Sequence, residues 1–339
     1  MALIDGDAVN WAEASVLVTG GTGSFGNKFV ELMLSRHRPR RLVVFSRDEL
    51  KQSEMATRFA DMDRRANEGD SSMRFFVGDV RDRERLGRAM HGVDVVFHAA
   101  AMKQIPACEY NPFEAIQTNI LGTKNVIDAA IDQGVKRVIG ISTDKAVNPF
   151  NLYGATKLCA EKLLVQGNVY GHPRGTVFSV VRYGNVIGSR GSVNAVFAAQ
   201  RSSGRVTVTD RRMTRFWIQL DRGVEFAIRC AELMRGGEIF VPKIPRMRIM
   251  DLVEAVAPGC EIQDIGIRPG EKLHEILVSQ DESRQGVEYA DLFVIEPHSP
   301  SWQYSSAAGG QRLASGFQYS SDAGDTWLTL AEMKELAGD

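Results

Sequence analysis

The sequence predicts an α/β protein with a doubly wound parallel sheet and a smaller C-terminal lobe. Three observations support this prediction: short apolar runs alternate with amphipathic helical patterns, a glycine-rich turn follows the first run, and the alternation loosens after about residue 185. Alternating strands and helices imply right-handed crossovers, which place helices on both faces of a parallel sheet. We therefore expect a main domain over residues 1–185. Residues 186–339 should form mainly a second lobe, with some segments returning to the main sheet.

Short apolar runs and helical periodicity define the expected elements. The predicted strands are Ser15–Thr19, Leu42–Phe45, Met73–Val77, Val93–Ala99, Arg137–Ser142 and Phe178–Arg182. The predicted helices include one after Ser24, one at Ile116–Gln133 and one at Tyr153–Val169. The stretch His298–Gly324 is rich in Ser and Gly, which predicts irregular structure. The apolar spacing from Trp327 to Leu336 predicts a closing helix.

The composition excludes several classes of protein. Lys and Arg number 41 against 42 Asp and Glu, so we expect neither nucleic acid nor a membrane surface as a partner. Four cysteines lack disulfide or metal spacing, and His274-Glu275 lacks the second histidine of a zinc helix. No apolar run reaches the length of a membrane span, and the acidic opening Met1–Asp7 is unlike a signal peptide. We expect a soluble cytoplasmic protein with reduced, mostly buried cysteines and no metal.

A dinucleotide fingerprint lies between the first strand and its helix. Its residues are Thr19, Gly20, Gly21, Thr22, Gly23, Ser24, Phe25 and Gly26. Glycines let the backbone approach a pyrophosphate, and the helix N-terminus supplies N–H donors and positive potential. The first domain is therefore predicted to be a Rossmann domain that binds a dinucleotide.

The end of the second strand lies where a Rossmann domain reads the ribose. Arg47, with Ser46 and Lys51 as further donors, favours the 2'-phosphate of NADP, whereas Asp48 keeps NAD as an alternative. After the third strand, Asp79-Val80 is placed to touch the adenine; a turn or capping role for Asp79 is an equal alternative.

The fifth strand leads into Thr143-Asp144-Lys145, and Tyr153 and Lys157 follow. Tyr-x-x-x-Lys spacing places a phenol and an ammonium one helical turn apart, which suits a phenolate that takes a proton from an alcohol. Asp144 and Lys145 add an acid/base pair that simple alcohol oxidation does not need. A solvated pair on a loop is the alternative interpretation of these two residues.

These features resemble the extended short-chain dehydrogenase/reductases, and within them the inverting UDP-N-acetylglucosamine 4,6-dehydratases. The resemblance runs from about Ser15 to Pro297 and reappears at Phe317–Asp322 and Trp327-Leu328. The motifs that carry it are Phe45–Glu54, Ala100–Gln104, Ser142–Ala146, Asn151–Lys157, Arg182–Gly191, Met213–Trp217, Gly237–Lys243 and Arg268–His274. The resemblance implies an NADP-dependent lyase that acts on a nucleotide sugar at the start of pseudaminic acid synthesis, as a homo-oligomer such as a hexamer.

The chemistry of such an enzyme assigns roles to the residues. Hydride leaves C4 of the hexose, the resulting ketone acidifies C5, water leaves from C6, and hydride returns to C6. Tyr153 fits the base at the C4 hydroxyl, with its pKa lowered by Lys157 and by the charge of the oxidised nicotinamide, and Thr143 binds the C4 oxygen. By analogy with the family, Asp144 is the acid at C6 and Lys145 the base at C5, which requires burial and nearby cations to depress the pKa of Lys145.

The resemblance also implies residues that line the binding site. Ala99, Ala100 and Lys103 follow the fourth strand, where the chain passes the nicotinamide; for Lys103, a surface position is the alternative. Asn185, Arg215 and Arg268 are expected on the substrate side, because planar arginines suit a diphosphate. Glu271 either binds the uridine ribose or begins a helix after Pro269-Gly270.

Rival functions remain open from the sequence. A UDP-hexose 4-epimerase shares the fold, the cofactor and Tyr-x-x-x-Lys, but it has no use for Asp144 and Lys145. A dehydratase and 5-epimerase of another sugar nucleotide is a second rival. A dinucleotide-binding regulator without turnover is a third, and it could lose the catalytic residues that this chain retains.

Overall fold

The structure, a computed structural model, describes residues 8–66, 71–187, 193–298 and 300–337. Two segments used in the sequence analysis fall outside these residues. One is the acidic opening Met1–Asp7, and the other is the end of the Arg182–Gly191 motif, from residue 188 onward.

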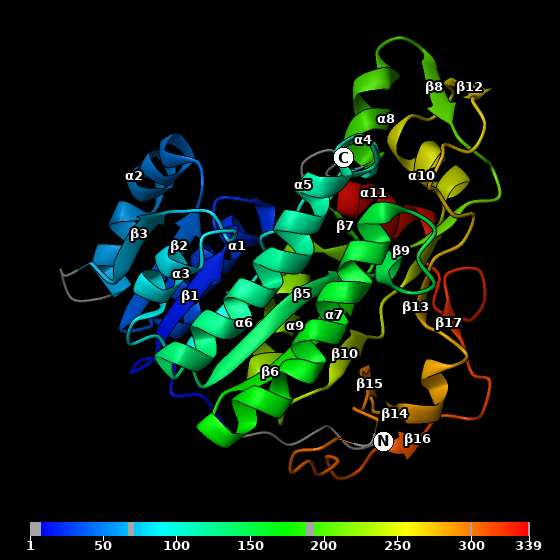
Figure 1. The fold of residues 1–339 in the computed structure, drawn as a ribbon. Helices are drawn as coiled ribbons and strands as arrows, with labels where there is room; N and C mark the ends of the chain where they lie inside the picture. The colour runs from blue at the N-terminus through cyan, green and yellow to red at the C-terminus, as the bar shows by residue number, and fades with distance from the viewer. Residues whose placement is uncertain (1–7, 67–70, 188–192, 299, 338–339) are drawn as a thin grey trace.

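A ten-stranded sheet forms the centre of the molecule (Figure 1). Its strands are β1 (Ser15–Thr19), β2 (Arg41–Ser46), β3 (Met73–Val77), β4 (Val95–His98), β5 (Arg137–Thr143), β6 (Val177–Tyr183), β10 (Ile239–Pro242), β14 (Gly286–Glu288), β15 (Leu292–Ile295) and β16 (Gln311–Arg312). Their order is β16-β14-β15-β10-β6-β5-β4-β1-β2-β3. From β10 to β3 all neighbours are parallel, and β15, β14 and β16 add an antiparallel edge. The predicted doubly wound parallel sheet is confirmed.

Helices cover both faces of this sheet. They include α1 (Ser24–Leu32) with its continuation η1 (Met33–His37), α2 (Glu49–Ala66), α3 (Arg83–Met90), α4 (Ile105–Tyr110), α5 (Pro112–Ile116), η2 (Gln117–Leu121), α6 (Gly122–Gln133), α7 (Leu152–Gly171), η4 (His172–Arg174) and α9 (Leu220–Leu233). In Figure 1, α6 and α7 cross the near face of β5, and α9 lies behind the sheet. Val16, Val18 and Phe29, each fully buried, belong to the core between these layers.

A second lobe lies beyond the carboxyl ends of the parallel strands. Its elements are β7 (Asn185–Ile187), α8 (Val193–Arg201), β8 (Arg205–Val208), β9 (Thr214–Gln219), β11 (Arg246–Arg248), α10 (Ile249–Val256), β12 (Glu261–Asp264) and α11 (Leu330–Ala337). A separate apolar cluster, which includes Phe197, Trp217 and Leu252, fills it. The domain boundary at residue 185 stays a prediction, while β10 and β14 to β16 do lie in the main sheet.

Two short strands correct the expectation for His298–Gly324. This stretch is mostly irregular, but it contributes β16 and also β17 (Tyr319–Ser320), which pairs with β13 (Ile276–Val278). The predicted closing helix is present as α11. Only two of the four cysteines are buried; Cys159 is exposed and Cys260 half-buried, contrary to the expectation for most of them. Among the described helices, none combines the length and apolar character that a membrane span requires.

Candidate active site

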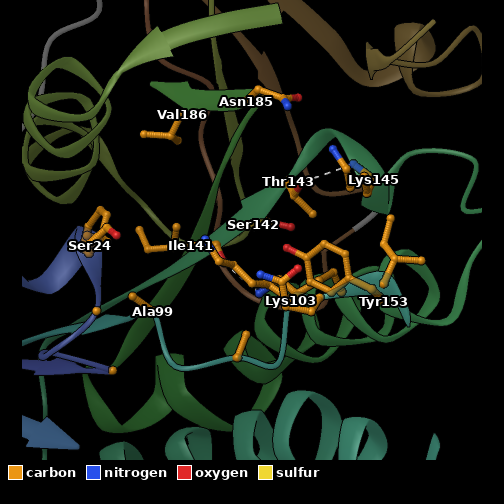
Figure 2. Close-up of a pocket in the computed structure, with 18 of the residues that line it drawn as sticks. Ser24, Ala99, Lys103, Ile141, Ser142, Thr143, Lys145, Tyr153, Asn185 and Val186 are labelled. Atoms are coloured by element: carbon orange, nitrogen blue, oxygen red, sulfur yellow. Dashed lines mark hydrogen bonds between the residues drawn. The ribbon is translucent and has the colours of Figure 1, made fainter. Parts of the chain in front are cut away.

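A cavity of about 940 Å³ lies at the carboxyl ends of the parallel strands. Its wall comes from the turns after β1 to β6 on one side, and from β8, β9 and α8 of the second lobe on the other. The strand order reverses beside β1, which is where open α/β sheets bind ligands. In Figure 2, Ser24 lies on one side of the cavity, and Thr143, Lys145 and Tyr153 lie on the other.

The glycine-rich turn has the close backbone contacts of a dinucleotide site. Gly20 has φ +67°, and a Cβ on it would lie 2.9 Å from the Ala100 backbone. A Cβ on Gly26 would lie 2.1 Å from the Gly21 carbonyl oxygen, so α1 packs tightly against the turn. The fingerprint residues that line the cavity are Gly20, Thr22, Gly23, Ser24 and Phe25. These features fit a dinucleotide whose pyrophosphate lies at the start of α1.

The other fingerprint residues act behind the cavity wall. Thr19, Gly21 and Gly26 do not line it. The Thr19 hydroxyl instead pairs with His98 Nδ1 at 2.8 Å and accepts a hydrogen bond from the Ala100 amide. These residues shape the turn and hold it against β4.

The residues predicted to bind the cofactor after the second, third and fourth strands line the same cavity. They are Ser46, Arg47, Asp48, Lys51, Asp79, Val80, Ala99 and Ala100. The Arg47 guanidinium lies 3.8 Å from the Asp79 carboxylate and is 64% exposed. A hydrogen bond from Lys51 lowers the pKa of Asp48. Asp79 also accepts the Arg81 amide, so it shapes a turn as well as lining the cavity.

The acid/base pair lies on η3 (Asp144–Ala146), the single turn that follows β5. The Thr143 hydroxyl donates to Asp144 Oδ1 at 2.8 Å, and the Lys145 ammonium donates to the same oxygen at 3.1 Å. Asp144 is fully buried, which excludes the solvated-pair interpretation. Thr143 and Lys145 line the cavity, but Asp144 does not.

The pKa of Lys145 is opposite to the prediction. Burial alone would lower it, but the carboxylates of Asp144 and Glu275 outweigh burial and raise the pKa of Lys145 above its ordinary value. In this state Lys145 is an ammonium ion. The base that the mechanism needs must therefore be generated by proton transfer within the site.

Tyr153 and Lys157 lie in the first turns of α7, and both line the cavity. Asn151 caps this helix by accepting the Gly154 amide at 2.8 Å. Burial raises the pKa of Tyr153 to about 12, contrary to the predicted lowering by Lys157. The Lys157 ammonium donates to the Ile141 carbonyl at 2.7 Å, and burial lowers the pKa of Lys157 to about 8. The spacing was predicted correctly, but the protonation was not.

The five residues predicted for the substrate side also line this cavity. They are Lys103, Asn185, Arg215, Arg268 and Glu271. Asn185 Oδ1 and Glu271 Oε2 are buried without a hydrogen-bond partner among the described residues, as expected of atoms that meet a ligand. Arg268 is 58% exposed and lies 3.6 Å from Glu271. The interpretation that Glu271 begins a helix is wrong, because residues 265–275 contain no helix.

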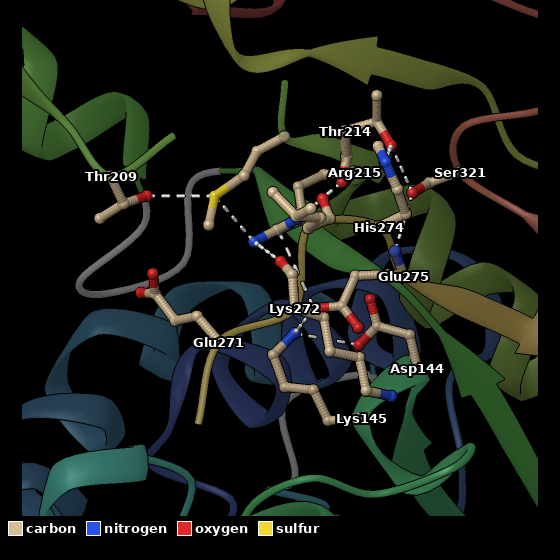
Figure 3. Close-up of polar contacts among 12 residues, drawn as sticks. Asp144, Lys145, Thr209, Thr214, Arg215, Glu271, Lys272, His274, Glu275 and Ser321 are labelled. Atoms are coloured by element: carbon tan, nitrogen blue, oxygen red, sulfur yellow. Dashed lines mark hydrogen bonds and ion pairs between the residues drawn. The ribbon is translucent and has the colours of Figure 1, made fainter. Parts of the chain in front are cut away.

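Arg215 was predicted to contact a diphosphate, and in the structure it bonds to backbone carbonyl oxygens. Its guanidinium donates to the carbonyl oxygens of Thr214, Lys272 and Leu273 (Figure 3). These bonds tie β9 to the loop that precedes β13. Contact with a diphosphate stays a prediction for this residue.

Sequence reasoning missed Glu275 and Lys272. Glu275 lines the cavity, and its carboxylate lies 3.6 Å from the Lys145 ammonium. Lys272 donates to the Val147 carbonyl directly after η3. In Figure 3 both side chains lie near Asp144 and Lys145, although more than 120 residues separate them in the chain. No local pattern around them signals this proximity.

Solved structures define the class of protein. The "X-ray structure of Pen from Bacillus thuringiensis" is 37% identical, has a TM-score of 0.86, and the match covers 96% of this chain and 97% of that chain. A Thermus thermophilus UDP-glucose 4-epimerase in complex with NAD is 25% identical, with a TM-score of 0.62 and coverage of 76% and 88%. The fold is that of the Rossmann-type short-chain dehydrogenase/reductases.

The sequence comparisons define the family. Residues 16–297 match the family described as polysaccharide biosynthesis protein. The chain is 49% identical over 331 residues to UDP-N-acetylglucosamine 4,6-dehydratase (inverting) of Campylobacter jejuni, covering 95% of this chain and 96% of that relative. It therefore belongs to this family of hydro-lyases, and the predicted resemblance is confirmed. It is also 39% identical over 336 residues to a UDP-glucose 4-epimerase of Rickettsia conorii, covering 96% of each.

Proposed function

We propose that this protein dehydrates UDP-N-acetylglucosamine, with NADP, to the 4-keto-6-deoxy sugar inverted at C5. The product is UDP-2-acetamido-2,6-dideoxy-β-L-arabino-hexos-4-ulose, which opens pseudaminic acid synthesis. The main support is the Asp144–Lys145 pair, joined at 3.1 Å, of which Lys145 lines the same cavity as Tyr153. A 4-epimerase exchanges hydride only at C4 and needs no acid and base for C5 and C6. Similarity to the Campylobacter jejuni relative supports the same choice of substrate and outcome.

The cavity supports a bound nicotinamide dinucleotide. The turn at Gly20 and the start of α1 would hold the pyrophosphate. Arg47, Ser46 and Lys51 would hold the 2'-phosphate of NADP, and NAD is the alternative because Asp48 lies beside them. When bound, the nicotinamide takes hydride from C4 and returns it to C6.

Tyr153 takes the proton of the C4 hydroxyl in this proposal. Burial holds the pKa of Tyr153 at about 12, so a positive charge beside the phenol is needed to favour the phenolate. Lys145 acts on Tyr153 in this direction in the present structure. Lys157, one turn further along α7, would hold the nicotinamide ribose, and Thr143 would bind the C4 oxygen.

In this proposal, one proton moves from Lys145 to Asp144 before dehydration, and each residue then has the protonation state that its step requires. Transfer from the Lys145 ammonium to the Asp144 carboxylate, across their hydrogen bond, leaves a neutral amine and a carboxylic acid. The amine then removes the C5 proton, and the acid protonates the oxygen that leaves C6. Both residues then have their starting protons again. When hydride returns to C6, C5 takes up one proton, directly or through water, at the expense of the proton that Tyr153 took from the C4 hydroxyl, so the cycle consumes no net proton.

The substrate lies between the two lobes in this proposal. Arg215 and Arg268 face the diphosphate, Glu271 the uridine ribose, and Lys103 and Asn185 the sugar. A boundary at residue 185 then separates the NADP domain from a lobe that is mainly for the nucleotide sugar. A cytoplasmic homo-oligomer, such as a hexamer, completes the proposal by analogy with the family.

The test is NMR and mass spectrometry of UDP-N-acetylglucosamine incubated with the purified protein and NADP in heavy water. We expect loss of one water and a 4-keto-6-deoxy sugar, inverted at C5 and carrying deuterium there. Epimerisation at C4 without loss of water would replace the proposal by the epimerase. Water loss with further epimerisation would favour the second rival, and an unchanged sugar would reject this substrate.

A further inference from the structure

Glu275 is a buried carboxylate to which the steps above give no role. Its side chain is 3% exposed and lines the cavity. Oε1 lies 3.6 Å from the Lys145 ammonium and 3.9 Å from Arg215 Nε. Oε2 has no hydrogen-bond partner among the described residues. An incompletely satisfied carboxylate in a buried position is costly, so its place beside Lys145 calls for a function.

Ser321, which directly follows β17, holds the backbone of Glu275. The Glu275 amide donates to Ser321 Oγ at 2.9 Å, and the Ser321 amide donates to the Glu275 carbonyl at 2.8 Å. Ser321 Oγ also pairs with the Thr214 hydroxyl of β9 at 2.7 Å. Figure 3 shows Glu275 between this support and the Asp144–Lys145 pair. Both backbone polar groups of Glu275 are therefore paired with Ser321, which is itself bonded to β9.

The charges around Glu275 come from three elements. They are Asp144 and Lys145 on η3, Arg215 on β9, and Lys272 on the loop before β13. Burial raises the pKa of Glu275, and Lys145 acts against this rise. His274 lies next to Glu275 in the sequence, but its ring Nδ1 pairs with the Thr214 hydroxyl. The three cations each oppose the rise that burial causes in the pKa of Glu275, while Asp144 adds to it.

We propose that Glu275 is a positioning residue for Lys145. The Glu275 carboxylate supports the positive charge that Lys145 gains when it takes the C5 proton. This inference rests on the proposed function. The C5–H bond breaks, the proton bonds to Lys145 Nζ, and the electron pair stays on the sugar as the C6–O bond breaks. Asp144 gives its proton to the leaving oxygen, which departs as water. Glu275 keeps its negative charge throughout and exchanges no proton.

The first test needs neither substrate nor cofactor. Competitive labelling of the protein's amines with acetic anhydride across pH, read by mass spectrometry, gives the pH midpoint for Lys145. Glu275→Gln should lower this midpoint by about one pH unit or more, because the carboxylate no longer favours the ammonium. Glu275→Asp keeps the charge and should retain most of the wild-type midpoint. An unchanged Lys145 midpoint in Glu275→Gln would overturn the proposal.

A lysine–glutamate pair outside the cavity supplies the matched control. Lys243 Nζ donates to Glu288 Oε1 at 2.6 Å, and neither residue lines the cavity. Glu288→Gln should leave the labelling midpoint of Lys145 unchanged, because this pair lies outside the cavity. Thermal unfolding of Glu275→Gln beside Glu288→Gln shows whether the fold is intact.

The second test follows C5 directly. With UDP-N-acetylglucosamine in heavy water, Glu275→Gln should slow deuterium entry at C5 at least tenfold, while hydride removal at C4 changes less. Glu275→Asp should recover part of the C5 rate. Equal C5 rates in wild type and Glu275→Gln would overturn the inference. If the wild-type protein leaves this sugar untouched, the proposed function fails, whereas the labelling result still decides the role of Glu275.

Discussion

Gly154 lies where α7 packs closely against η3, the turn that carries Asp144 and Lys145. A Cβ on Gly154 would lie 2.1 Å from the Lys145 carbonyl oxygen, whereas real Cβ contacts essentially never fall below 3.0 Å. The obstacle is backbone, so no side-chain rotation relieves it. Gly154→Ala must therefore move α7 away from η3, by most of an ångström. This shift separates Tyr153 from Lys145.

The expected cost is larger for the rate than for stability. Overpacking costs about 1–3 kcal/mol of unfolding free energy. A misplacement of about 1 Å in a catalytic group lowers a rate about 100-fold. We therefore expect Gly154→Ala to fold, with a reduced melting temperature, and to form the 4-keto product about 100-fold more slowly. Cofactor binding should change less than the rate, because the turn at Gly20 belongs to β1 and α1, and only the nicotinamide ribose would be held from α7, by Lys157.

Gly87→Ala is the matched control for this experiment. Gly87 also lies within a helix, α3, but its nearest neighbour for a Cβ is the Gln133 side chain at 3.9 Å. This substitution should keep the wild-type rate and gain up to about 1 kcal/mol from helix propensity. Product formation by mass spectrometry, with thermal unfolding in parallel, measures both variants. Wild-type turnover by Gly154→Ala would refute the reasoning that close contact between α7 and η3 sets the geometry.

Four further predictions test other residues of the site and of the core. Lys145→Ala should still bind NADP and the UDP-sugar, measured by calorimetry, but lose dehydration; dehydration at the wild-type rate would remove Lys145 from the mechanism. Arg47→Ala should weaken NADP about tenfold or more and NAD much less, since only NADP carries the 2'-phosphate; equal losses would contradict that contact. Arg182→Met leaves the buried Glu161 carboxylate without its 2.7 Å partner, so denaturant unfolding should show a loss of about 3–5 kcal/mol. In cofactor-free protein, amine labelling of Lys157 should have its midpoint near pH 8, because burial lowers the pKa of Lys157 to about 8; a midpoint near 10.5 would contradict this burial effect.

Structural features that depend on short stretches of sequence could be predicted. The strands, the glycine turn and the spacing of Tyr153 and Lys157 each depend on neighbours within a few residues, and the structure places them as predicted. The sheet followed as well, because alternating strands and helices leave few topologies. The short strands β16 and β17 were missed, since each has only two residues and forms by pairing with a distant strand.

Protonation was not predictable from the same patterns. The expected low pKa of Lys145 assumed burial and nearby cations, but the structure places two carboxylates, Asp144 and Glu275, beside it, and they outweigh burial. The expected low pKa of Tyr153 assumed the charges of Lys157 and of an oxidised nicotinamide, whereas in the protein alone burial raises it. Both errors have one cause. Desolvation and charge depend on every element packed around a group, including elements far away in sequence.

The two lobes contribute different parts of the chemistry. The main domain supplies the dinucleotide turn, Tyr153 and Lys157, to which the proposed function assigns the exchange of hydride at C4. The surroundings of Lys145 come instead from β9 and from the loop before β13, through Arg215 and Glu275. In the proposed function, removal of the C5 proton depends on how strongly Lys145 holds a proton, and therefore on this second set of residues. We infer that the second lobe, together with the Asp144–Lys145 pair, determines whether such a site dehydrates its sugar or only oxidises and reduces it at C4.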